Sequence, residues 1–232
     1  MKMNMNKLNV IYEDNHIIVV EKQPNIPSQA DKTEDIDMLT IIKEYIKEKY
    51  NKPGNVYLGL VHRLDRPVGG VMVFAKTSKA ASRLSDQVRE KIFKKKYLAV
   101  VDGRFEQIKG ILEDYLYKDE RNNISKVVNK DKKNAKLAKL DYEVLEYKPD
   151  KDLSLVKVNL HTGRHHQIRL QMSNFGHSIF GDQKYGTRGQ GKQIALWAYE
   201  LTIEHPITKE EMTFKCLPES NGTWCILRDV SI

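Results

Sequence analysis

Residues 56–75 read VYLGLVHRLDRPVGGVMVFA, and this stretch decides the fold. Two apolar runs rich in β-branched residues, Val56–Val61 and Val71–Ala75, have the length and composition of buried strands. Between them lies a polar loop, residues 62–70, in which a proline and a Gly-Gly pair restrict the backbone to a tight turn. The stretch therefore predicts two core strands holding a rigid loop whose backbone can approach a ligand closely.

This loop carries one carboxylate, Asp65, which lies between Arg63 and Arg66 with His62 nearby. A guanidinium beside a carboxylate favours the charged form, which suits a nucleophile or an electrostatic stabiliser and does not suit an acid. The alternative is an aspartate in a structural ion pair at a β-turn. Charge and spacing alone leave both interpretations open.

Outside the loop, strand patterns are mixed with a few helical ones. The expected helices are Met38–Tyr50, capped by Asp35 or Asp37, Ser78–Glu90, capped by Ser78, and Gln167–Asn174, stopped by Gly176. The expected strands are Leu8–Glu13 and Ile17–Lys22 as a hairpin, Phe93–Val101, two or three within 111–147, Leu153–Leu160, Ile194–Glu204 and Glu211–Leu217. Because strands and helices do not alternate regularly, the pattern indicates an α+β fold.

The composition is that of a globular protein with a basic surplus. The 232 residues include 39 Lys and Arg against 31 Asp and Glu, a net charge of +8, and no apolar run of about 20 residues that could span a bilayer. Residues 1–7 are expected to be a loose tail. Cys216 and Cys225 fit no disulfide or metal spacing, which predicts reduced thiols and a cytoplasmic location.

Lysines concentrate in two segments, residues 118–139 and Lys91–Lys96, the second running into Tyr97. A clustered cationic surface favours a polyanionic partner such as RNA, because binding releases counterions. An exposed ring beside such lysines, for which Tyr97, Phe180 and Tyr185 are candidates, can stack on a base. The alternatives are a solvated face that protects edge strands, and packing of the rings in the core.

A second constellation is HTGRHHQIRL, residues 161–170, which gathers Arg164, His165, His166 and Arg169 around a glycine. At a junction between a loop and a helix these groups can contact phosphate. A zinc site is disfavoured, because Thr162-Gly163 interrupts a helical His-x3-His pair and no HExxH glutamate is present. We therefore expect no metal here.

The loop GTRGQGKQ, residues 186–193, nearly fits a phosphate-binding loop. Gln193 replaces the hydroxyl residue that would hold magnesium, and no apolar strand leads into the loop. We reject a nucleoside triphosphate site. Contacts of Lys184, Arg188 and Lys192 with an RNA backbone are expected instead.

Taken together, six segments in order resemble the RluA-type family of pseudouridine synthases, over about Val10 to Pro218. They are IYEDNHIIVVEKQPNIPSQ (11–29), HRLDRPVGGVMVFAKT (62–77), KKYLAVVDG (95–103), HTGRHHQIRLQM (161–172), GDQKYG (181–186) and IALWAYELTIEHP (194–206). The resemblance implies a mixed, mostly antiparallel sheet with flanking helices and a central cleft. It also implies a single catalytic domain over residues 8–232, without an N-terminal accessory RNA-binding domain.

The resemblance implies roles for individual residues as well. Asp65 is the catalytic aspartate, Tyr97 packs on the target base, Arg164 keeps the aspartate ionised, and Arg63 fills the space left by the flipped nucleotide. The RNA-binding residues expected are His62, Arg63, Arg66, Lys95, Lys96, His166, Gln167, Arg169 and Lys184. The substrate implied is a stem-loop of ribosomal RNA or else transfer RNA, acted on by a monomer without cofactor or metal.

Two departures from the family pattern concern the loops. Val68-Gly69-Gly70 stands where Thr-Ser-Gly or Val-Ser-Gly is common, and His165 stands where a threonine is usual. They bear on substrate identity more than on activity.

Two other classes of function compete with a synthase. One is an RNA-binding protein with a dead site, which would be expected to lose Asp65, Tyr97 or Arg164. The other is a nucleoside or glycoside hydrolase, which usually needs a second carboxylate. Asp182 is the candidate within these segments, and its setting is typical of a turn.

Overall fold

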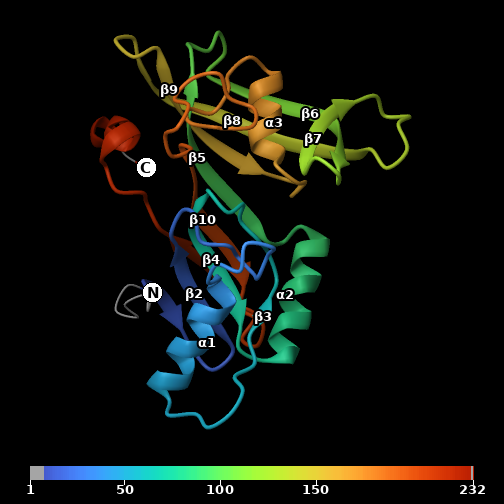
Figure 1. The fold of residues 1–232 in the computed structure, drawn as a ribbon, viewed down its shortest axis with the longest axis vertical. Coiled ribbons are helices and arrows are strands. Elements are labelled where there is room, and N and C mark those ends of the chain that lie inside the picture. Colours follow the sequence, from blue (N-terminus) through green and yellow to red (C-terminus); the bar gives the residue numbers. More distant parts are fainter. Residues whose placement is uncertain (1–7, 231) are drawn as a thin grey trace. The chain divides into compact units, whose positions relative to one another are not determined.

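The computed structural model describes residues 8–230 and 232 (Figure 1). The chain divides into two compact units. The first unit comprises Met1–Phe93 with Ala198–Cys216, and the second comprises Lys94–Trp197 with Leu217–Ile232. The tail predicted at residues 1–7 lies outside the described residues, and the single catalytic domain stays a prediction.

The first unit is built on a sheet with β4 at its centre, in which β1-β2, β2-β4, β3-β4 and β10-β11 are antiparallel pairs. The neighbours run β1-β2-β4-β10, with β3 also pairing with β4 and β11 pairing with β10. The strands are β1 (Val10–Glu13), β2 (Ile17–Lys22), β3 (Gly59–Leu60), β4 (Gly69–Ala75), β10 (Leu196–Glu204) and β11 (Glu211–Lys215). Every residue of β4 is buried, as expected for a strand covered on both faces.

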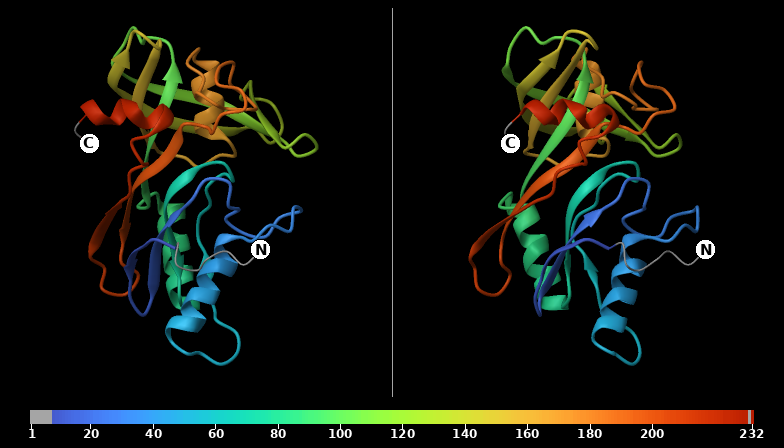
Figure 2. Two further views of the ribbon diagram at one scale, coloured as in Figure 1. Left: turned by 60° about the vertical axis from the view of Figure 1, so that its left-hand side comes forward. Right: turned by 90° about the vertical axis from the view of Figure 1, so that its left-hand side faces the viewer.

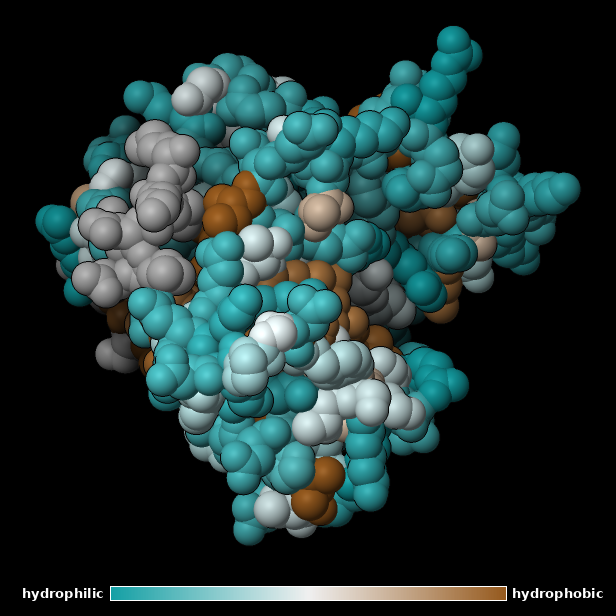
Figure 3. Space-filling view, turned by 60° about the horizontal axis from the view of Figure 1, so that its bottom comes forward, coloured by the Kyte–Doolittle hydropathy of each residue, from teal (hydrophilic) through white to brown (hydrophobic). Residues whose placement is uncertain are grey.

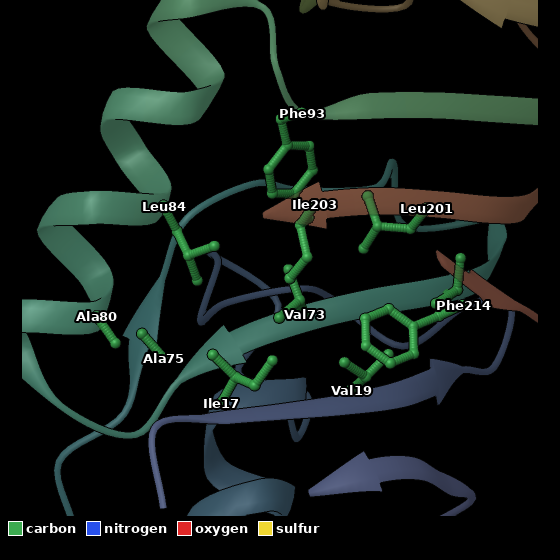
Figure 4. Close-up of a cluster of buried hydrophobic side chains, with 11 residues drawn as sticks. Ile17, Val19, Val73, Ala75, Ala80, Leu84, Phe93, Leu201, Ile203 and Phe214 are labelled. Carbon is green, nitrogen blue, oxygen red and sulfur yellow. The ribbon is translucent and has the colours of Figure 1, made fainter. Parts of the chain in front are cut away.

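Two helices complete this unit, α1 (Met38–Lys49) and α2 (Ser78–Glu90). Figure 4 shows Leu84 of α2 beside Ile17, Val73 and Ile203 from three strands, all of them 0% exposed. Full burial of each such side chain favours folding by about 1.5–3 kcal/mol. This core holds the start of β4, and with it the end of the 62–70 loop.

The second unit is an antiparallel sheet in the order β5-β9-β8-β6-β7. Its strands are β5 (Lys94–Asp102), β6 (Lys109–Asp119), β7 (Ile124–Val128), β8 (Lys136–Lys148) and β9 (Leu153–Leu160). Helix α3 (Gln167–Asn174) packs through Leu170 on Leu116 and Ala138. A 3-10 helix, η2 (Gly222–Asp229), lies beside the strands of this unit in both views of Figure 2.

The α+β class and most elements expected from the sequence are confirmed. The hairpin β1-β2, helix α3 and strand β9 have the predicted bounds or lie within two residues of them. Three strands cover the region 111–147, where two or three were expected. Of the two proposed caps for α1, Asp37 is the one that accepts hydrogen bonds, from the amides of Leu39 and Thr40.

Four expectations are corrected. The strand expected at Val56–Val61 is reduced to Gly59–Leu60, because only these residues pair with β4. The cap of α2 is Thr77, whose hydroxyl accepts from the amide of Ala80, so Ser78 is the first helical residue. The last two strands are shorter than expected, and η2 was not predicted.

On the face of the molecule in Figure 3, hydrophilic residues predominate and hydrophobic ones are scattered between them. This agrees with the charged content of 30%. Among the described residues, no helix combines the length and the apolar character that a membrane crossing demands.

Candidate active site

The Asp65 loop, residues 62–70, joins β3 to β4 and is fastened at several points. Leu64 and Val68, on either side of Asp65, are 6% and 2% exposed, whereas Asp65 itself is half-buried. The amide of Val68 donates to the carbonyl oxygen of Asp65 at 2.9 Å, which closes a turn. The buried hydroxyl of Ser28 donates to the carbonyl oxygen of Leu64 at 2.9 Å and accepts from its amide at 3.2 Å.

Lys22, the last residue of β2, supports the loop from inside the unit. Its side chain is 0% exposed. Its ammonium group donates to the carbonyl oxygens of Gln23 at 3.1 Å, Arg66 at 2.9 Å and Val68 at 2.7 Å. An ammonium has three protons to donate, so these bonds use all of them. Burial lowers the pKa of Lys22 to about 7, an effect that the nearby carboxylate of Asp65 opposes.

Gly70, at the end of the loop, is required by close packing. Gly70 has φ +127°, and a Cβ atom there would lie 2.1 Å from the carbonyl oxygen of Ala198 on β10. A side chain at this position would therefore collide with backbone. The departure Val68-Gly69-Gly70 leaves this requirement intact.

The three basic residues near Asp65 in the sequence, His62, Arg63 and Arg66, have different surroundings. Arg66 forms an ion pair with Asp35 and donates to Thr33 at 2.8 Å, which ties the loop to residues 31–35. His62 is 9% exposed, and its Nε2 accepts from the amide of Val73 at 3.1 Å. Arg63 is exposed. Of the three, His62 is buried, whereas the side chain of Arg66 is 38% exposed although it is ion-paired.

In the second unit, β5 carries Tyr97, which is 6% exposed and lies opposite Val158 of β9. Because side chains alternate along a strand, Lys95 lies on the same face as Tyr97, and Lys96 on the other. Burial lowers the pKa of Lys95. A Cβ atom at Gly163 would lie 3.4 Å from the Lys95 nitrogen, so this cation lies beside the turn that carries Arg164.

That turn is fixed on β8 by Gln167. The Oε1 of Gln167 accepts from the amide of Arg164 at 3.0 Å and from the hydroxyl of Thr162 at 2.7 Å, and its Nε2 donates to the carbonyl oxygen of Lys139. The side chain of Arg164 is exposed, and its Nε donates to the carbonyl oxygen of Leu137 at 2.8 Å. Gln167, expected at an RNA interface, is thus 3% exposed and organises the Arg164 turn.

His166 and Arg169 are also buried, at 8% and 4% exposure. Arg169 binds both carboxylate oxygens of Asp182, at 2.6 and 2.7 Å, and lies over the ring of Tyr185. The hydroxyl of Tyr185 is 2.9 Å from His166 Nδ1 and accepts from the amide of Ser125. Burial lowers the pKa of His166 to about 2, with the charge of Arg169 adding to the effect, so the ring is neutral.

This buried group fits poorly with the hydrolase alternative. Asp182 is 0% exposed and also accepts from the amides of Lys184 and Tyr185. Burial raises its pKa, but the hydrogen bonds of Arg169 outweigh this and lower it. A carboxylate held ionised and enclosed is a poor second acid or base.

The remaining sequence candidates lie on the surface. The Lys184 ammonium is exposed and donates to the carbonyl oxygen of Asn123 at 2.8 Å. Arg188 donates to the carbonyl oxygens of Lys151 and Asp152 and so fastens its own loop. Within the part of the chain that the structure describes, no group of three or more His, Cys, Asp and Glu is placed to hold a metal ion.

Lys22 and Ser28 support the backbone of the Asp65 loop, a role that was not predicted from the sequence. Their signal was present but weak. Lys22 ends a strand that is otherwise buried, IIVVEK, and a cation at such a position needs internal acceptors. The pattern did not indicate which carbonyls those would be.

Comparison with known proteins gives a consistent result. A family model described as RNA pseudouridylate synthase matches residues 16–174. The "Uncharacterized RNA pseudouridine synthase YjbO" of Bacillus subtilis (strain 168) is 34% identical over 212 residues, covering 89% of this chain and 71% of that protein. The "Dual-specificity RNA pseudouridine synthase RluA" of Escherichia coli (strain K12) is also 34% identical over 212 residues, covering 89% of this chain and 91% of that one.

Solved structures agree on the fold. Human RNA Pseudouridylate Synthase Domain Containing 1 superposes with a TM-score of 0.75 at 23% identity, covering 95% of this chain and 86% of that one. Human RNA Pseudouridylate Synthase Domain Containing 4 gives 0.76 at 22% identity, covering 91% and 89%.

Proposed function

Because this chain belongs to the RluA-type family of RNA pseudouridine synthases, which are isomerases, we propose that Asp65 is the carboxylate on which its reaction depends. The anchoring of the loop is the observation that supports this role. Lys22, Ser28 and the Val68 amide fasten the backbone on both sides of Asp65, and the carboxylate itself remains half-buried. Such anchoring holds a reacting group in a fixed position, which lowers the entropy cost of reaching the transition state.

The reaction breaks the bond between ribose and N1 of uracil, turns the base, and joins ribose to C5. Substrate and product are isomers, so no electrons are gained or lost and no redox cofactor is needed. Asp65 can attack the anomeric carbon, add to the uracil ring, or assist loss of a ribose proton. The target base must leave its stack, which costs a few kcal/mol.

The roles that we propose for the other residues follow from the resemblance to the family. Tyr97 packs on the target base, and Arg164 keeps the aspartate ionised. Arg63, whose side chain is exposed, fills the space that the flipped nucleotide leaves. Lys95 and Lys96, with the exposed ammonium of Lys184, are the contacts we propose for the RNA backbone. His62, Gln167, His166 and Arg169 are buried, so we assign them the support of these surfaces.

The substrate we propose is a stem-loop of ribosomal RNA, with transfer RNA as the alternative. Single-stranded loops expose bases that a protein can extract. The Escherichia coli relative is named for dual specificity. We further propose that the enzyme acts as a monomer in the cytoplasm.

The test is Asp65→Asn, assayed by mapping pseudouridine at single-nucleotide resolution in total RNA. A strain that carries only this variant should lack the modification seen in its parent, because an amide is a far weaker nucleophile and base. Glu48→Gln, on an exposed position of α1, likewise converts a carboxylate to an amide and should leave the site fully modified. Full modification by Asp65→Asn would refute the assignment, and release of free uracil by the wild type would support a hydrolase.

A further inference from the structure

A cavity of about 610 Å³ opens in the second unit, walled by η2 on one side and by β5, β8, β9 and the loop around residues 180–192 on the others. Figure 2 shows η2 beside these strands. Val100 of β5 lines the cavity. Because Val100 and Tyr97 are three residues apart on one strand, they point to opposite faces of the sheet. The cavity therefore does not include the Tyr97 side of β5.

The inner part of the cavity is apolar. Val100 is 0% exposed, Leu153 and Ile226 are each 7% exposed, and the half-buried ring of Phe180 lies in the same lining. These side chains come from β5, β9, η2 and the loop, so the surface is assembled by the fold of the unit. Such a surface suits a flat, poorly hydrated body such as a nucleobase.

The rim is cationic. Lys148, Lys151, Lys192 and Arg228 line the cavity with a single carboxylate, Asp150. Lys151 and Lys192 are exposed, and the guanidinium of Arg228 is oriented by its bonds to the carbonyl oxygen of Ser220 at 3.0 and 3.3 Å. Four cations against one acid around an apolar floor favour a ligand that joins an anionic group to an apolar ring.

We propose that this cavity binds a nucleotide, with its base on the apolar floor and its phosphate at the rim formed by Lys151, Lys192 and Arg228. The volume lies within the range of roughly 300–1,000 Å³ typical of small-ligand sites. The nucleotide is either part of the RNA substrate, away from the target uridine, or a free mononucleotide. Binding of a nucleotide of the RNA substrate rests on the proposed function, whereas binding of a free mononucleotide does not.

The two cysteines of the chain supply a direct readout. Cys225 lines the cavity and is half-buried. Cys216 belongs to the first unit, and burial raises the pKa of its thiol to about 12. Since the thiolate is the reactive form, Cys216 should react far more slowly than an ordinary thiol at pH 8. Alkylation of Cys225 therefore reports on occupancy of the cavity.

The experiment measures alkylation of Cys225 by iodoacetamide at pH 8, resolved by peptide mass spectrometry, with and without uridine 5′-monophosphate or a stem-loop RNA. At about ten times Kd, a bound nucleotide should slow the reaction about tenfold. Protection by the mononucleotide identifies the free ligand, and protection by RNA alone identifies the substrate as its source. If neither protects Cys225, the proposal is overturned.

Variants separate this site from RNA bound elsewhere. Lys151→Glu with Lys192→Glu should abolish the protection, whereas Lys43→Glu with Lys47→Glu on exposed positions of α1 should preserve it. Equal protection in both double variants would also overturn the proposal. Asp65→Asn should keep the protection of Cys225 while losing pseudouridine formation, so failure at one site is distinguishable from failure at the other.

Discussion

At the scale of single residues, Lys22 shows how the half-buried Asp65 can be held in place through the backbone of its loop. Its three hydrogen bonds go to backbone carbonyls, two of them in the Asp65 loop. The side chain of Lys22 is 0% exposed, and its burial is tolerated because each proton of the ammonium group has an acceptor. Lys22 is thus a positioning residue, and its effect reaches the reaction through the backbone of Arg66 and Val68.

Replacing this lysine tests that role. Lys22→Met keeps the length of the side chain and removes the donors, leaving three carbonyls without them. We expect the free energy of unfolding to fall by about 2–4 kcal/mol, and kcat to fall about tenfold or more with a smaller change in KM. Urea unfolding measures the stability change, and steady-state pseudouridylation, run where the variant is fully folded, measures kcat and KM. Lys43→Met on the exposed face of α1 is the control, and an unchanged kcat would contradict the positioning role.

Sequence reasoning reached the Asp65 loop but not its supports. Asp65 and Arg63 stood out because polar residues interrupt two apolar runs. His166, Gln167 and Arg169 were expected at a surface because they are polar, yet each is less than 9% exposed. His166 contacts Tyr185, Arg169 binds Asp182, and Gln167 donates to the carbonyl oxygen of Lys139. These partners are distant in sequence, so composition and spacing could not reveal the burial.

At the scale of elements, prediction succeeded where residues in or next to the element mark its ends. Helix α3 was predicted to the residue, because its ends are marked by a Thr-Gly turn and by Gly176. The stretch at 56–61 failed for the opposite reason. Its β-branched residues favour a strand, but strand pairing needs a partner, and β4 offers one only to Gly59–Leu60. Helix η2 has no side-chain hydrogen bond at its N-cap residue, Asn221, so no capping signal marked its start.

Glu13 joins three elements of the first unit, and this yields a pH dependence. Its carboxylate, with a side chain 6% exposed, accepts from Lys49 and Tyr50 at the end of α1 and from Lys76 after β4, at 2.6–2.9 Å. Burial raises its pKa, but the hydrogen bonds of Lys49 and Lys76 outweigh this and lower it to about 2. The folded state therefore binds a proton less readily than the unfolded chain. The stabilisation is complete above the unfolded pKa of about 4.3 and is lost as pH falls toward 2.

Glu13→Gln should remove that dependence. We expect the variant to be less stable than the wild type by about 1–3 kcal/mol at pH 7, with the difference shrinking between pH 4.5 and 2. The range is kept low because Lys49 is partly exposed and its ion pair is screened. Guanidinium unfolding at pH 7, 4 and 3 gives the measurement. Parallel stability curves for the two proteins would show that Glu13 does not carry the pH dependence.

At the scale of the whole molecule, the net charge of +8 leaves open which lysines meet RNA. Within 118–139, several are paired with acids in the second unit. Lys118 lies 2.6 Å from Glu120, and Lys139 lies 3.3 Å from Glu113. Others project from the turn between β7 and β8, where Lys130 and Lys133 are exposed and Lys136 begins the next strand. If this turn is only a solvated face, replacing its lysines should change RNA binding no more than replacing exposed lysines elsewhere.

The salt dependence of RNA binding distinguishes the two interpretations. Removing one lysine that binds a phosphate should reduce the slope of log K against log salt by about 0.7–0.9. Lys130→Gln, Lys133→Gln and Lys136→Gln together should therefore lower the slope by about 2–3 if all three bind phosphate. The control replaces Lys43, Lys47 and Lys79 by glutamine on exposed positions of α1 and α2, an equal change in charge. Filter binding from 50 to 300 mM salt measures both, and equal slopes for the two triple variants would mean that the turn is a solvated face. A reduced slope confined to the first triple, with Kd rising by the same factor for every stem-loop tested, would identify the turn as a surface that binds the RNA backbone without sequence preference, because phosphates are the same in every sequence.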